Sequence, residues 1–88
     1  MKNPFKKTVW VLEGIEYDEK TKKIKVTAVF GVHKDRNWGL AHLHRLGYLN
    51  GKLLGTVIDE DGIQRVGAHV MYNANGSLAR VHEMTLEK

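Results

Sequence analysis

Residues 24–33 read IKVTAVFGVH, and this stretch decides the fold class. Its apolar residues alternate with the others, which is the period-two pattern of a β-strand with one buried face. The apolar positions are Ile24, Val26, Ala28, Phe30 and Val32. The preceding segment 8–17, TVWVLEGIEY, is rich in β-branched and aromatic residues, and the polar residues 18–23 separate the two. The sequence therefore predicts a β-hairpin at the start of the chain.

A helix is predicted after this hairpin, over residues 37–50. A polar break at residues 34–37 offers Asp35 or Asn37 as the N-cap, and leucines then recur at every third position. Gly39 and Gly47 each weaken a helix by about 1 kcal/mol relative to alanine, so packing must hold this one. The dipeptide Asn50-Gly51 is its expected end.

Three further strands are expected in the second half of the chain. They cover residues 53–59, 63–72 and 77–86, and the turn sequences DEDG and NANG separate them. The resulting order, ββαβββ, predicts a single α+β domain over residues 1–88 with a largely antiparallel sheet and one helix packed on one face. Residues 1–6 and 87–88 are expected to be loose tails.

The size and composition exclude several classes of protein. A chain of 88 residues holds one small core of modest stability, so a partner subunit is a reasonable expectation. The absence of cysteine excludes a disulfide framework, a thiolate metal site and a cysteine nucleophile. Apolar runs are too short for a membrane span or a signal peptide. We expect a soluble cytoplasmic protein that does not insert into membranes and has no cofactor.

Charge is unevenly distributed along the sequence. Residues 1–52 carry 11 Lys and Arg against 5 Asp and Glu, whereas residues 53–88 carry 3 against 5. The pI is about 9.5. A small domain with one basic pole is attracted to anionic partners, among them nucleic acids and acidic protein surfaces.

The first candidate site is the outer face of the predicted helix. At 100° per residue the leucines share one sector, and His44, Arg45 and Tyr48 lie on the opposite side. Arginine offers a planar fork for phosphate, tyrosine a donor and a stacking surface, and histidine a titratable proton. Lys34 and Arg36 precede the helix and extend this cationic set. The alternative interpretation is an ordinary solvated helix face.

The second candidate site is on the last two strands. Arg65, His69, Arg80 and His82 occupy alternating positions there. If the turn at residues 73–76 has two or four loop residues, all four side chains share one face of the sheet, and an odd-length or bulged turn moves two of them away. The alternative interpretation is a solvent-facing sheet surface that carries long basic side chains.

Two further motifs, a histidine pair and a tryptophan, lie in the predicted helix. His42 and His44 form an H-x-H pair, but residues two apart on a helix diverge, and no third ligand lies at motif spacing, so no metal site is expected. Trp38 lies within an apolar pattern, which favours a core or interface position. An exposed Trp38 beside Lys34 and Arg36 would instead form a base-stacking site.

These patterns favour a binding module for a phosphate-bearing partner, namely RNA, DNA or a nucleotide. One alternative is a protein-interaction module, such as an inhibitor of a host enzyme or a homodimeric accessory protein. The other is a small metal-independent ribonuclease, in which His44, His69, His82, Arg45 and Tyr48 would supply the acid, the base and the phosphate contacts. Catalytic, Walker and dinucleotide-binding signatures are absent from the sequence, so an enzyme is the less favoured reading.

Overall fold

The predicted α+β fold is confirmed by the structure, a computed structural model that describes residues 7–86. The elements are β1 (Lys7–Tyr17), β2 (Ile24–His33), α1 (Arg36–Arg45), β3 (Asn50–Ile58), β4 (Gln64–Tyr72) and β5 (Leu78–Leu86). The expected tails, residues 1–6 and 87–88, lie outside the described residues. Residues 7–86 contain no helix that could span a membrane.

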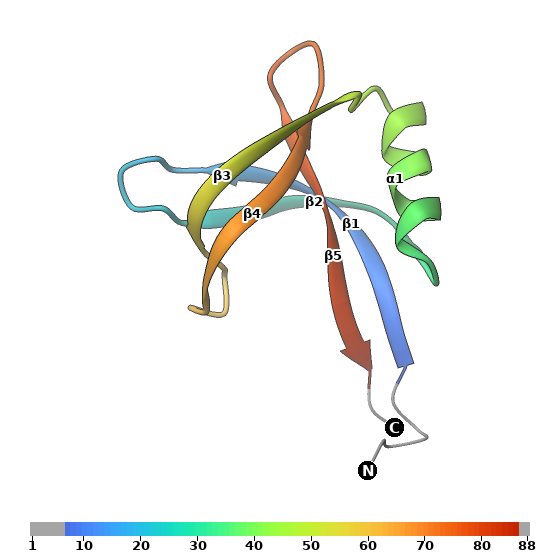
Figure 1. Ribbon diagram of the computed structural model, residues 1–88, viewed down its shortest axis with the longest axis horizontal. Coiled ribbons are helices and arrows are strands. Elements are labelled where there is room, and N and C mark those ends of the chain that lie inside the picture. Colours follow the sequence, from blue (N-terminus) through green and yellow to red (C-terminus); the bar gives the residue numbers. More distant parts are fainter. Residues whose placement is uncertain (1–6, 87–88) are drawn as a thin grey trace.

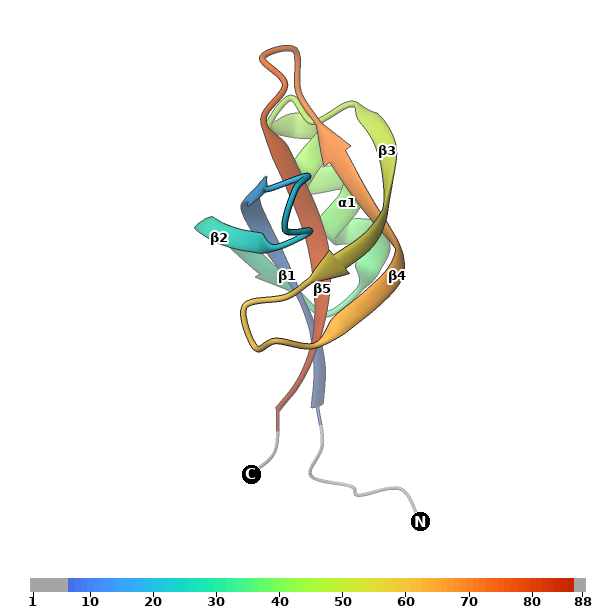
Figure 2. The ribbon, with the colours of Figure 1, turned by 90° about the vertical axis from the view of Figure 1, so that its left-hand side faces the viewer.

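All five strands form one sheet in the order β2-β1-β5-β4-β3, and each neighbouring pair is antiparallel. The two edges of the sheet approach each other at one point. The backbone N–H of Ile58, at the end of β3, donates to the carbonyl of Lys22 at 2.6 Å, and Lys23 and Ile58 form a parallel bridge. The sheet is therefore curled into a partly closed barrel, with β3 and β4 folded away from α1 (Figures 1 and 2).

The curl gives the sheet two apolar faces, and neighbouring residues of one strand supply different cores. Met71 and Ala79 belong to the core under the helix, whereas Val70 and Leu78 belong to the core inside the curl. The first core contains Leu12, Leu43, Tyr48, Met71 and Ala79, and the second contains Ile15, Ile24, Val57 and Val70.

Helix α1 packs on the first of these faces through Leu43, which is fully buried. Gly39 lets the helix come close to the sheet, because a Cβ at this position would lie 3.0 Å from a methyl group of Leu12. The glycine that weakens the helix by propensity thus permits the packing that stabilises it. Asp35 is the N-cap, and its side chain accepts a hydrogen bond from the backbone N–H of Asn37 at 2.7 Å.

The helix is shorter than predicted, ending at Arg45 and not at Asn50. Gly47 adopts a left-handed conformation with φ +102° and donates to the carbonyl of His44, while Tyr48 donates to the carbonyl of Leu43. These two bonds form a Schellman motif. The motif ends the helix and directs Tyr48 back toward the core beside Leu43.

Candidate functional site

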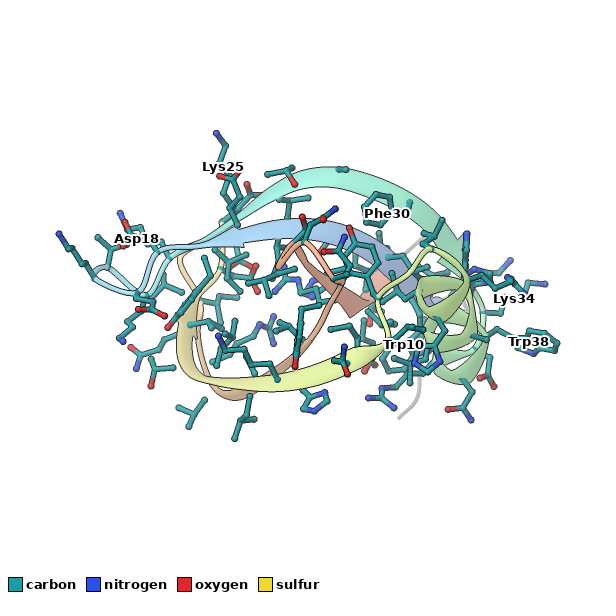
Figure 3. All side chains as sticks on the ribbon, turned by 90° about the horizontal axis from the view of Figure 1, so that it is seen from above. Trp10, Asp18, Lys25, Phe30, Lys34 and Trp38 are labelled. Atoms are coloured by element: carbon teal, nitrogen blue, oxygen red, sulfur yellow. The ribbon has the colours of Figure 1, made fainter. Side chains whose placement is uncertain are left out.

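The start of helix α1 carries an exposed aromatic residue. Trp38 is 65% exposed, which resolves the sequence ambiguity in favour of a surface position. Lys34 and Trp38 both point away from the molecule on the side of α1 (Figure 3). Arg36 is also exposed, and the first turn of the helix contains no acidic residue. An indole and several cations therefore occupy the same end of the molecule.

The exposed stripe continues toward the end of the helix. Trp38 and Arg45 are seven residues apart, which places them on nearly the same side of the helix and about 10 Å apart along its axis. Both Arg45 and His44 are exposed. We call Lys34, Arg36, Trp38, His44 and Arg45 together the helix surface.

Within residues 7–86, no carboxylate forms an ion pair with the cations of the helix surface. Residues 36–58 contain neither Asp nor Glu. Asp35, which lies just before this segment, uses its side chain to cap the helix. Among the residues that the structure describes, Lys34, Arg36 and Arg45 form no ion pair. Their charges are therefore available to an anionic partner.

Tyr48 does not belong to the helix surface, so its prediction was wrong. It is only 8% exposed and packs against Phe30, with the ring centroids 5.8 Å apart and the ring planes at 39°. The helical-wheel argument placed it outside because it assumed that the helix continues past Gly47. The Schellman motif ends the helix before Tyr48, so the backbone turns at Gly47 and the Tyr48 side chain lies in the core.

The second predicted site, on β4 and β5, is not formed. Tyr72 pairs with Leu78, so the loop between the strands has five residues, an odd number. Gly67 adds a second change of register, because it has φ +73° and no partner in β3. An extra residue of this kind is a β-bulge, and it reverses the alternation of side chains beyond it. The loop is odd in length and β4 contains a bulge, so the four residues do not share one face of the sheet.

Two of the four cations are instead neutralised in a buried network. Arg80 is 8% exposed and donates to Glu13 at 2.8 Å and to Asp59 at 2.6 and 3.1 Å. Arg65, half exposed, donates to the same Asp59 at 3.0 Å. The expectation that Arg80 faces solvent was wrong, because the curled sheet covers the face that a flat sheet would expose. The two cations of this network are balanced by the carboxylates of Glu13 and Asp59, so the network stabilises the fold and leaves no free positive charge for a ligand.

This network controls the ionisation of Asp59. Hydrogen bonds from Arg80 lower the pKa of Asp59 from 3.8 to about 2, although the burial of the carboxyl acts in the opposite direction. Asp59 is therefore an anion at every ordinary pH. The sequence offers Glu13 as one possible acid of a Glu/His/Arg set across the sheet, but its pairing with Arg80 and Asp59 was not predicted, because the three residues are far apart along the chain.

The histidines of the ribonuclease hypothesis are dispersed. His44 lies on the helix surface, and the ring of His69 lies over Gly51 at the pairing of β3 with β4. His82 is half-buried on β5, opposite Val11 of β1. The structure does not bring these side chains together around one phosphate.

His42 and His44 diverge, as the helix geometry predicts. The ring of His42 packs over Gly31 and lies in hydrogen-bond contact with the ring of His33, with Nδ1 and Nε2 3.0 Å apart. The two rings are nearly perpendicular, at 85°. No pattern in the sequence indicates this pair, which links α1 to the end of β2.

No protein-family model matches this sequence, and comparison with curated proteins and with solved structures found no match.

Proposed function

We propose that this protein binds single-stranded nucleic acid through the helix surface. The observation that carries the proposal is the exposure of Trp38 among unneutralised cations. A large aromatic side chain that is 65% exposed contributes little to folding, whereas it offers a flat surface on which a base can stack. The surrounding positive charges, which attract phosphate groups, come from Lys34, Arg36 and Arg45.

The dimensions of the helix surface suit a strand of several nucleotides. Trp38 and Arg45 lie about 10 Å apart along the helix axis. A single strand can therefore stack one base on Trp38 while a neighbouring phosphate contacts Arg45. Single-stranded nucleic acid is favoured over a duplex, because bases inside a duplex are already stacked and cannot reach the indole.

The proposal is tested by replacing the stacking residue. A fluorescein-labelled decauridylate is titrated with wild-type protein and with Trp38→Ala, and binding is followed by fluorescence anisotropy. Base stacking on an aromatic side chain contributes roughly 1–3 kcal/mol, so the variant should bind at least about fivefold more weakly. Leu53→Ala is the matched control, since Leu53 is 64% exposed on β3 and lies outside the helix surface. Equal binding by wild type and Trp38→Ala would disprove the role of the indole.

A second candidate function, protein interaction, rests on a different part of the surface. Strand β2 lies at the edge of the sheet, and its residues Val29 and Val32 are 61% and 57% exposed. Exposed apolar residues on an edge strand favour pairing with another chain. Sedimentation of the protein over a range of concentrations tests self-association, and Val32→Lys should abolish any dimer. A monomer at all concentrations would remove the homodimer from consideration.

A further inference from the structure

A groove lies beyond the end of the helix, on the same side of the sheet. It has a volume of about 510 Å³ and lies between the β1–β2 hairpin and the turn that joins β4 to β5. Its aromatic wall is formed by Phe30 and Tyr48, and its polar groups come from Glu16, Thr27 and Ser77. We call it the Phe30 groove. The volume lies within the range of small-ligand sites.

The shape of the groove depends on a glycine in β1. A Cβ at Gly14 would lie 3.0 Å from Cζ of Phe30, which is closer than most real Cβ contacts, so the ring would have to shift to accommodate it. Gly14 therefore lets the Phe30 ring lie directly across β1, where it forms part of the groove beside Tyr48. This arrangement offers a flat apolar surface next to hydrogen-bonding groups, which is the combination that a nucleobase requires.

The groove continues the helix surface. Tyr48 follows Arg45 by three residues, and the Schellman motif turns it into the wall of the groove. A strand that runs along α1 from Trp38 to Arg45 therefore arrives at the groove with its next bases. This inference rests on the proposed function, because the strand must first be held by the helix surface.

The carboxylate of Glu16 determines which base fits. Glu16 is exposed and lines the groove, and it forms no ion pair among the described residues. A carboxylate has two acceptor oxygens and no donor. Guanine presents two adjacent donors, N1–H and N2–H, on its Watson–Crick edge, whereas the other bases each present an acceptor beside their donor. We propose that the Phe30 groove binds a guanine base, with Glu16 accepting both hydrogen bonds.

The test compares four oligonucleotides. Fluorescein-labelled decauridylate and three versions with one central G, A or C are titrated with the full chain, and binding is followed by anisotropy. The version with G should bind about tenfold more tightly than decauridylate, and those with A and C should not. In Glu16→Gln this gain should disappear while binding of decauridylate persists. Glu19→Gln, which removes an exposed carboxylate from the adjacent turn, is the matched control and should keep the gain.

Each outcome separates the two proposals. If decauridylate binds and the central G brings no gain, or if Glu16→Gln keeps the gain, the guanine site is disproved and the helix surface stands. If none of the four oligonucleotides binds to wild-type protein, both proposals fail. A gain that is lost in both carboxylate variants would show a general charge effect and would also disprove the site.

Discussion

Arg80 is the residue on which the interior of the fold most depends. Its guanidinium lies between Glu13 and Asp59, and all three side chains are nearly inaccessible to solvent. Burial of charged groups is costly unless each has a partner, and here Arg80 is the partner of both carboxylates. One cation from β5 thus joins β1 to the segment that follows β3.

Replacement of Arg80 should therefore destabilise the protein strongly. Arg80→Ala leaves the buried Glu13 without a cation and Asp59 with only the half-exposed Arg65, and breaking a buried ion pair in this way costs roughly 3–5 kcal/mol. Arg65→Ala is the control, because Arg65 contacts the same Asp59 from a side chain that is 47% exposed, and it should cost no more than about 1 kcal/mol. Urea denaturation measures both free energies of unfolding. Similar losses in the two variants would contradict the assignment of the network to Arg80.

The same network predicts how stability depends on pH. The pKa of Asp59 is lowered to about 2 in the folded protein, against 3.8 as its ordinary value. The stabilisation from this carboxylate is therefore present above pH 3.8 and is lost as the pH falls through about 2. The expected loss is about 2 kcal/mol, from the relation between a pKa shift and free energy.

Denaturation of wild type and Asp59→Asn at a series of pH values between 2 and 5 measures this loss. The difference in unfolding free energy between the two proteins should shrink as the pH falls. Glu83→Gln is a control that removes an exposed carboxylate without an ion pair among the described residues. A constant difference between wild type and Asp59→Asn across this range would be evidence against the pKa assignment.

At the scale of elements, local patterns predicted most of the fold. The segment 24–33 alternates so regularly that both ends of β2 were predicted correctly, and the other strands were found with small errors at their ends. The helix was the least accurate element, since its leucine spacing continues to Leu46 beyond its true end. Gly47 was the signal that could have ended it earlier, because a glycine after a helix favours the left-handed conformation.

The parts of the candidate site that sequence could not predict depend on register and curvature. Exposure of Trp38 depends on how the helix rotates against Leu12, a contact between residues far apart in sequence. The separation of Arg65 from His69 depends on the bulge at Gly67. Such features result from the closure of the whole sheet, so a pattern read along one strand does not contain them.

Gly47 itself gives a prediction about the helix end. A side chain at φ +102° is strained, so Gly47→Ala should lower the free energy of unfolding by roughly 1–2 kcal/mol. Gly47→Asn should cost less, because asparagine adopts the left-handed conformation more readily. Thermal unfolding followed by circular dichroism ranks the three proteins. If alanine were tolerated as well as asparagine, the Schellman motif would not be the cause of the helix end.

At the scale of the whole molecule, the fold divides its charges between two roles. Arg65 and Arg80 are paired with Glu13 and Asp59 inside the curl, so this network adds no net charge. The segment 36–58 has cations and no carboxylates. Part of the positive charge of the sequence is therefore available at the helix surface, where it attracts an approaching anion.

This division predicts a measurable salt dependence. If Lys34, Arg36 and Arg45 each neutralise one phosphate of a single strand, the logarithm of the binding constant should fall with the logarithm of salt concentration with a slope of about −2. Arg45→Gln should reduce the steepness by about 0.7, because one phosphate contact is lost. Lys20→Gln, in the exposed turn between β1 and β2, removes the same charge away from α1 and should leave the slope nearly unchanged. Titrations of labelled decauridylate between about 25 and 200 mM salt, a range over which the Debye length falls roughly threefold, measure these slopes. A slope near zero in wild type would mean that binding does not depend on phosphate contacts, and equal slopes in the two variants would place those contacts away from the helix.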